Sequence, residues 1–196
     1  NNIIRNVLED GFGNLWVITH QGINRYNSST DTFQHFMDEP ANIPFLENNI
    51  RACIGSDSTI WVSQIGKGLS RYSPGDNAFK EVTIEGVSKQ WLASVVELIY
   101  FNRLLYLLGS DGKLLCVLDN HVLYTKELGK ITNSSFHKFI QLHGNYFLAV
   151  FNAHEKLQLY NLSETDREPY SINLGKVSIS SLSENLDKTA IWIGTE

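Results

Sequence analysis

The sequence predicts an all-β fold made of repeated four-stranded antiparallel units, and three observations support this prediction. A Trp-Val pair, a Gly-x-x-Arg-Tyr run and a Phe occur twice in the same order. The spacing is nearly constant, since Trp16 and Trp61 lie 45 positions apart and Tyr26 and Tyr72 lie 46 apart. No stretch of ten or more residues combines helical spacing of apolar residues with capping signals. A repeat of this length indicates a supersecondary unit that stacks on its neighbours.

The first unit reads as four short extended runs, at residues 3–8, 15–19, 23–27 and 33–36. The segments between them are rich in Gly, Asn, Asp, Ser and Thr, which favour turns because they accept positive φ or bond their own backbone. Four strands in about 45 residues are typical of a β-propeller blade.

The later units keep this order with less conserved residue types. Residues 102–108 and 112–117 supply two strands of a third unit, and residues 145–150 and 156–160 do so for a fourth. A fifth unit begins near residue 177 and stops within residues 190–195. The sequence therefore predicts a β-propeller fragment of about four and a half blades. We place the blade limits near residues 1–47, 48–90, 91–134, 135–176 and, for the incomplete blade, 177–196.

Four and a half units do not match the closure of a propeller, in which the first and last blades pack on each other. We expect the first and last units to leave apolar surface exposed. The chain, which begins with Asn1 rather than Met, is therefore interpreted as a piece of a larger protein, or as one that completes its packing through another copy.

The motif residues also resemble a known family. Gly-Leu-x-Arg-Tyr at residues 68–72, the closing Phe79, and Ile-Trp-Ile-Gly-Thr at residues 191–195 closely resemble the two-component regulator propeller repeat. The resemblance is strong over residues 1–84 and 177–196 and is limited to the pattern over residues 85–176. It implies a periplasmic, non-catalytic sensor region of a hybrid two-component histidine kinase from Bacteroidetes. Such a region would recognise a glycan-derived oligosaccharide or another small ligand, and would signal through a homodimer to genes for polysaccharide use.

Composition limits the other classes of function. The formal net charge is −5 and no cluster of Lys and Arg reaches four in a row, which argues against nucleic-acid binding. No run of 18 apolar residues suggests a membrane segment, and no motif suggests a cofactor. Cys53 and Cys116 lie in apolar runs without metal-ligand spacing, so we expect two buried thiols.

The expected ligand face carries the loops between second and third strands and the loops between blades, because loops from every blade converge there. The candidate ligand-binding residues on these loops are His20, Gln21, Gln64, Lys67, Trp91, Asp111 and His154. A metal or acid–base site, as in a propeller lyase, is the less favoured interpretation of the histidines with Asp111 and Glu155, and we expect no catalytic or metal-binding residue. A propeller that serves as a protein-interaction scaffold is a further alternative.

Trp91 has two interpretations. As the start of the first strand of the third unit, it could present a ring on which a sugar stacks, or it could fill the core between two blades, as aromatic residues more often do. Trp16, Trp61 and Trp192 recur in register and are assigned to packing between blades.

Three further features are assigned to structure. We expect Arg25 and Arg71 to bond backbone carbonyl groups of the adjoining strand. The Asp10–Asn14 segment lacks the alternating carboxylates of a calcium loop and is predicted to be a β-turn with a glycine bulge.

Overall fold

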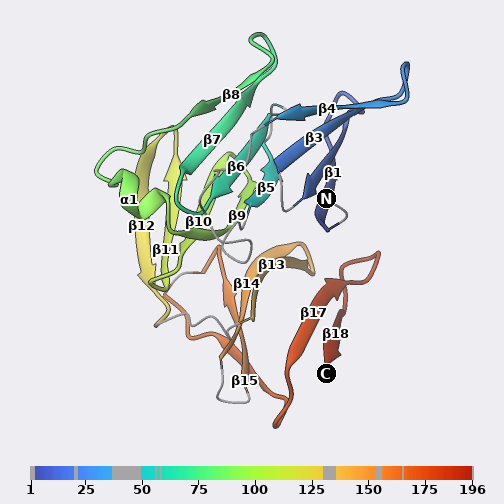
Figure 1. The fold of residues 1–196 in the computed structure, drawn as a ribbon. Helices are drawn as coiled ribbons and strands as arrows, with labels where there is room; N and C mark the ends of the chain where they lie inside the picture. Colours follow the sequence, from blue (N-terminus) through green and yellow to red (C-terminus); the bar gives the residue numbers. More distant parts are fainter. Residues whose placement is uncertain are drawn as a thin grey trace. The chain divides into compact units, whose positions relative to one another are not determined.

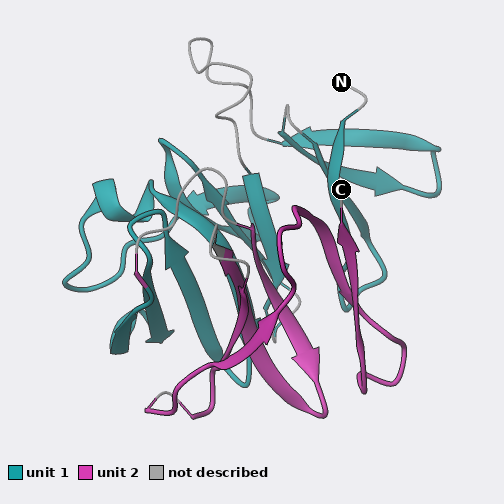
Figure 2. Cartoon of the chain, turned by 90° about the horizontal axis from the view of Figure 1, so that it is seen from below, with its two compact units in different colours: residues 1–128 teal, residues 129–196 magenta. Residues whose placement is uncertain are grey.

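The computed structural model describes residues 3–19, 22–36, 50–55, 57, 59–129, 136–152, 156–164 and 166–195. The chain divides into two compact units, residues 1–128 and residues 129–196, which are coloured separately in Figure 2.

Within the described residues, unit 1 contains three four-stranded antiparallel sheets, in which each strand pairs with the next one along the chain (Figure 1). The first sheet comprises β1 (Ile4–Glu9), β2 (Leu15–Thr19), β3 (Gly22–Asn27) and β4 (Thr32–Phe36). The second comprises β5 (Ile50–Ile54), β6 (Ile60–Gln64), β7 (Gly68–Ser73) and β8 (Ala78–Glu81). The third comprises β9 (Val95–Phe101), β10 (Leu104–Gly109), β11 (Lys113–Leu118) and β12 (His121–Glu127).

Unit 2 contains, among its described residues, one four-stranded sheet and one two-stranded sheet. The four-stranded sheet comprises β13 (Phe136–Leu142), β14 (Asn145–Asn152), β15 (Lys156–Asn161) and β16 (Tyr170–Asn173). The two-stranded sheet comprises β17 (Ile179–Glu184) and β18 (Ile191–Thr195). The prediction of an all-β fold with about four and a half four-stranded antiparallel blades is confirmed.

The one helix found in the described part of the chain is α1 (Lys89–Leu92), a single turn between β8 and β9. Ser88 caps it, because the Ser88 side chain accepts a hydrogen bond from the backbone N–H of Trp91 at 3.1 Å. The expectation that Trp91 begins the first strand of the third unit was therefore wrong, since that strand starts at Val95. Ser88, a residue type that favours the N-cap position of a helix, was the sequence signal that could have revealed this turn.

The middle strands of the second sheet are more buried than its outermost strand. All five residues of β6 are buried, whereas the outer strand β8 has none buried. Trp16 is fully buried, and its ring lies 4.8 Å from that of Tyr72 in the next sheet. Trp61 is 8% exposed and stacks on Tyr100 of the third sheet at 6.2 Å. The expected packing of Trp16 and Trp61 between blades is confirmed.

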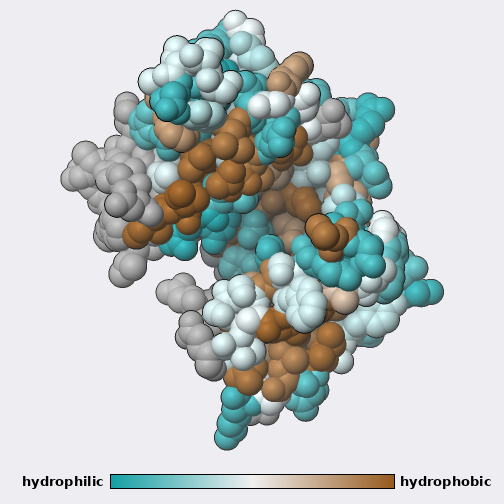
Figure 3. All heavy atoms as spheres, turned by 90° about the vertical axis from the view of Figure 1, so that its right-hand side faces the viewer, coloured by the Kyte–Doolittle hydropathy of each residue, from teal (hydrophilic) through white to brown (hydrophobic). Residues whose placement is uncertain are grey.

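Trp192 was expected to pack in the same way, and this expectation was wrong. Its side chain on β18 is 68% exposed, because unit 2 has no described sheet after β18 that could cover it. The apolar residues Ile4 and Val7 on β1 are also exposed. Figure 3 shows hydrophobic side chains, in brown, at the molecular surface on the face it draws. The expectation of apolar surface on the first and last sheets is therefore confirmed.

Both cysteines are free and buried, as expected. Burial raises the pKa of the Cys53 thiol and that of the Cys116 thiol, so both remain protonated at neutral pH.

The Asp10–Asn14 turn is organised by one buried carboxylate. Asp10 accepts hydrogen bonds from the backbone N–H groups of Phe12 and Asn14 and from the indole Nε1 of Trp16, the last at 2.9 Å. The turn has one glycine in the left-handed region, Gly13 with φ 79°. The Asp10 carboxylate therefore ties the turn to the core tryptophan of the same sheet.

Asp10 should make the stability of the chain depend on pH in the acidic range. Burial by itself raises the pKa of Asp10, but the hydrogen bonds from Trp16, Asn14 and Phe12 outweigh it and lower the pKa below its ordinary value. A carboxyl group with a lowered folded-state pKa stabilises the fold above about pH 4, its unfolded pKa, and this stabilisation is lost as pH falls through the folded-state pKa. We expect Asp10→Asn to lower the free energy of unfolding at pH 7 by about 1–3 kcal/mol.

Urea denaturation between pH 2 and pH 7, values chosen to bracket the roughly 3.9 reference pKa, measures this effect. The stability gap between the native chain and Asp10→Asn should narrow as the pH falls. Asp166→Asn is the control, because its exposed side chain has no hydrogen bond or ion pair within the described residues. A gap that stays constant over the whole range would contradict the assignment.

Candidate functional site

Three loops of unit 1 meet at one edge of the second and third sheets. The Gly66 N–H of the β6–β7 turn donates to the Ala93 carbonyl group at 2.8 Å, and the Ser110 N–H of the β10–β11 turn donates to the Ser94 carbonyl group at 3.0 Å. The segment that follows α1 is therefore held between the two turns. We call the groove at this edge the loop groove. It has a volume of about 680 Å³ and is lined by Ile65, Gly66, Lys89, Gln90, Ala93, Ser94 and Ser110.

Trp91 and Asp111, two of the candidate ligand-binding residues, contact each other beside the loop groove. The Trp91 indole Nε1 donates to the Asp111 carboxylate at 2.9 Å, and the same carboxylate accepts from the Lys113 backbone N–H at 3.0 Å. Trp91 is half-buried and packs against the core cluster between the second and third sheets. The structure thus places Trp91 in the packing role that was one of its two interpretations.

Gln64 and Lys67 belong to the β6–β7 turn at the same edge. Gln64 is buried at the end of β6, and its carbonyl group accepts a hydrogen bond from the Lys67 N–H at 3.0 Å. Lys67 is exposed. His20, Gln21 and His154 lie outside the described residues. The groove-lining Gln90 and Lys89 were missed by sequence analysis, because the helical turn that carries them was not predicted.

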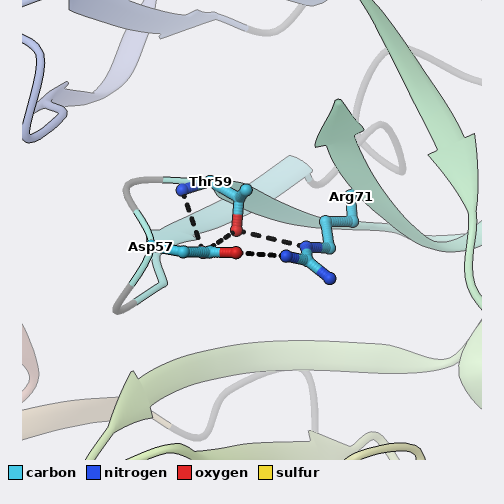
Figure 4. Close-up of polar contacts among 3 residues, drawn as sticks. All are labelled: Asp57, Thr59 and Arg71. Atoms are coloured by element: carbon cyan, nitrogen blue, oxygen red, sulfur yellow. Dashed lines mark hydrogen bonds and ion pairs between the residues drawn. The ribbon is translucent and has the colours of Figure 1, made fainter. Parts of the chain in front are cut away.

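A second polar cluster, Asp57, Thr59 and Arg71, lies near the β5–β6 loop and is drawn in Figure 4. The Asp57 carboxylate accepts from the Thr59 backbone N–H at 3.2 Å and from the Thr59 hydroxyl at 2.5 Å. The Arg71 guanidinium forms an ion pair with Asp57 and donates to the Thr59 hydroxyl at 3.2 Å. Burial alone raises the pKa of Asp57, but the hydrogen bonds from Thr59 and the charge of Arg71 lower it below its ordinary value. The Asp57 carboxylate is therefore ionised at neutral pH, and its contacts with Thr59 and Arg71 stabilise the loop.

The expectation that Arg25 and Arg71 bond backbone carbonyl groups was wrong, because both guanidinium groups bond side chains. Arg25 donates to the Tyr72 hydroxyl at 2.7 Å and to Gln34 at 2.8 Å. Each arginine stands opposite a tryptophan on the neighbouring strand, and its Cζ lies over that ring, at 5.7 Å for Trp16 and 5.4 Å for Trp61. The strand carbonyl groups beside them are used in the antiparallel ladder. Both arginines thus have structural contacts.

No group of three or more His, Cys, Asp or Glu side chains suited to a metal ion occurs within the described residues. The lining of the loop groove is mainly apolar, and its polar residues are Gln90, Ser94, Ser110 and Lys89. The Ser94 hydroxyl donates to the Trp91 carbonyl group, and Lys89 forms an ion pair with Glu81. Such groups can bind a polar ligand.

Comparison with known proteins identifies the fold. No family model and no curated protein matches the sequence. Two solved structures of the extracellular domain of the BT4673 system from B. thetaiotaomicron, described in one case as a one component system and in the other as a hybrid two component system, match all of this chain. The first has a TM-score of 0.70 at 18% sequence identity, and the second has 0.60 at 15%.

PorZ, an essential bacterial surface component of the type-IX secretion system of Porphyromonas gingivalis, matches 98% of this chain with a TM-score of 0.64 at 9% identity. The chain spans 28%, 33% and 23% of the lengths of the three solved chains. At these identities the likeness establishes the fold. The chain is therefore a β-propeller fragment that shares its fold with the extracellular domain of the BT4673 system.

Proposed function

We propose that the chain is part of a non-catalytic, periplasmic ligand-sensing region of a hybrid two-component system, and that its ligand is a glycan-derived oligosaccharide. The observation that carries this proposal is the match of the whole chain to the extracellular domain of BT4673. Within the described residues, no helix is long and apolar enough to cross a membrane.

The loop groove is the proposed place of ligand contact in this chain. Its volume of about 680 Å³ is within the range of roughly 300–1,000 Å³ that small-ligand sites occupy. Gln90 lines the groove, and Lys67 directly follows the lining residue Gly66 in the sequence. Both side chains are exposed and offer an amide and an ammonium group, which suit the hydroxyl groups of a sugar. Trp91 and Asp111 act here as supports, because their hydrogen bond joins α1 to the β10–β11 turn.

Calorimetric titration with a panel of neutral and acidic oligosaccharides tests this function. We expect one class of oligosaccharide to bind the complete extracytoplasmic region, and this chain alone to bind it weakly or not at all, because the loops of every blade build the ligand face. In the complete region, Lys67→Ala and Gln90→Ala should each weaken binding by about fivefold to tenfold, the loss of one hydrogen bond. The matched control is Lys80→Ala on β8, which removes a similar charge away from the loop groove. Equal affinity in the native protein and in the three variants would show that the ligand binds outside the loop groove. Absence of binding for every oligosaccharide would contradict the proposed sensing of a glycan.

A protein-interaction scaffold is the second candidate. It is favoured by the exposed apolar side chains of Ile4, Val7 and Trp192, together with the likeness in fold to PorZ, which is a surface component of a secretion system. Sedimentation velocity distinguishes it, since self-association that is lost in Trp192→Ser would support a role in protein contacts.

A further inference from the structure

The interface between the first and second sheets is filled by aromatic rings. Tyr72 on β7 and Phe79 on β8 lie against Trp16, with ring centroids at 4.8 Å and 6.1 Å. The Tyr72 hydroxyl accepts from Arg25 and donates to the Asn77 side chain at 2.8 Å. The Tyr72 ring thus packs in the interface, and its hydroxyl group makes hydrogen bonds with Arg25 and Asn77.

The equivalent positions between the second and third sheets lack these rings. Trp61 on β6 and Tyr106 on β10 occupy equivalent positions, and they pair with Arg71 and Cys116 on the next strand. The residue after each of these partners is Tyr72 in the second sheet and Val117 in the third, so Val117 takes the place of Tyr72. Phe79 pairs with Tyr72 and Val122 pairs with Val117, so Val122 takes the place of Phe79. Two aromatic rings are therefore replaced by two valines.

A pocket of about 370 Å³ lies at this interface, and we call it the valine pocket. Its lining is Asp57, Trp61, Arg71, Tyr100, Arg103, Leu105, Val117, Asp119 and Asn120. Tyr100 from the inner strand β9 stacks on Trp61 and restores only part of the missing aromatic volume. The floor is apolar because Leu105 and Val117 are both 3% exposed members of the core.

Three polar side chains at the rim of the valine pocket have no partner among the described residues. Asn120 precedes β12 as Asn77 precedes β8, and both have positive φ, at 68° and 49°. Asn77 is bonded by Tyr72 and Arg25, whereas the side chains of Asn120, Arg103 and Asp119 make no hydrogen bond or ion pair there. Arg103 also has positive φ, at 66°, which an arginine seldom adopts.

We propose that the valine pocket binds a phenolic carboxylic acid, a small aromatic ring that carries a hydroxyl and a carboxylate group. The ring would take the place that Tyr72 has in the preceding interface, since Val117, the counterpart of Tyr72, lines the pocket. The hydroxyl would bond Asn120 as the Tyr72 hydroxyl bonds Asn77, and the carboxylate would pair with the guanidinium of Arg103. The lining of the valine pocket is mainly polar, and its apolar floor of Leu105 and Val117, beside the rings of Trp61 and Tyr100, is the surface on which the aromatic ring would lie. This site is separate from the loop groove and does not rest on the proposed sensing of an oligosaccharide.

The test uses three probes, titrated calorimetrically into the chain. They are 4-hydroxybenzoate, benzoate, which lacks its hydroxyl group, and phenol, which lacks its carboxylate group. We expect 4-hydroxybenzoate to bind one to one with a dissociation constant of about 0.1 mM, the affinity that some ten well-placed heavy atoms provide. Benzoate and phenol should each bind about tenfold more weakly, because each lacks one polar contact.

Two variants locate the site. Val117→Tyr rebuilds the filled interface of the preceding sheets and should abolish binding while the β-sheet circular dichroism spectrum is retained. If Val117→Tyr does not fold, Arg103→Gln tests the site. It should reduce the affinity for 4-hydroxybenzoate about tenfold and leave the affinity for phenol unchanged, because phenol has no carboxylate to pair with Arg103. Arg167→Gln, an exposed arginine of unit 2, is the matched control.

Absence of 4-hydroxybenzoate binding would overturn the proposal. It would equally be overturned if Arg103→Gln bound 4-hydroxybenzoate with native affinity. A third contradicting result would be that glucuronate, a carboxylate without an aromatic ring, competes for the same site and binds more tightly than 4-hydroxybenzoate. These results leave the oligosaccharide titration of the loop groove unaffected, so the two sites succeed or fail independently.

Discussion

Trp16→Ala is expected to lower the free energy of unfolding by about 3–5 kcal/mol, as large truncations in protein cores do. Trp16 is fully buried, its ring contacts Phe36, Tyr72 and Phe79, and its indole N–H bonds Asp10 at 2.9 Å. The substitution therefore empties part of the interface between the first two sheets and leaves the Asp10 carboxylate without one of its donors. Urea denaturation followed by tryptophan fluorescence and circular dichroism measures the change.

Trp192→Ala is the matched control for this substitution. The same residue type stands at the corresponding position of β18, but its side chain is 68% exposed, so its removal should change stability by less than about 1 kcal/mol. Similar losses for the two variants would mean that the packing of Trp16 does not carry the stability we assign to it.

Gly109→Ala is expected to destabilise the chain by about 1–3 kcal/mol, because it overpacks a filled site. A Cβ atom at Gly109 would lie 2.5 Å from an oxygen of Asp111 and 2.7 Å from Cζ2 of Trp91. Both side chains would have to move, and with them the hydrogen bond that joins α1 to the β10–β11 turn. The loop groove should lose its shape, and oligosaccharide affinity should fall together with stability.

Gly75→Ala is the control for Gly109→Ala. A Cβ atom at Gly75 meets no atom within 4 Å, so this substitution should change the free energy of unfolding by less than about 0.5 kcal/mol. Thermal unfolding of both variants and a titration of the groove ligand provide the comparison. A neutral effect of Gly109→Ala would show that Trp91 can withdraw from the glycine without loss.

The sequence by itself determined the strand pattern and the two core tryptophans. Strands and turns follow from local properties, namely period-two burial, β-branched residues and Gly or Asn at positive φ, and the repeat places each strand by analogy with another copy. For the same reason the burial of Trp16 and Trp61 could be predicted from their register. The repeat also predicted the incomplete last sheet, in which β17 pairs with β18.

Only the tertiary structure decided which side chains meet across loops and between sheets. Arg25 and Arg71 occupy equivalent positions, yet Arg25 bonds Tyr72 of the next sheet while Arg71 turns to Asp57 of its own sheet. Val117 stands in the third sheet where Tyr72 stands in the second, so it offers Arg71 no hydroxyl group, and this contact depends on a residue far along the chain. The contact of Trp91 with Asp111 likewise required the single turn of α1, since the distance between two loops is set by their conformations and not by their spacing in the sequence.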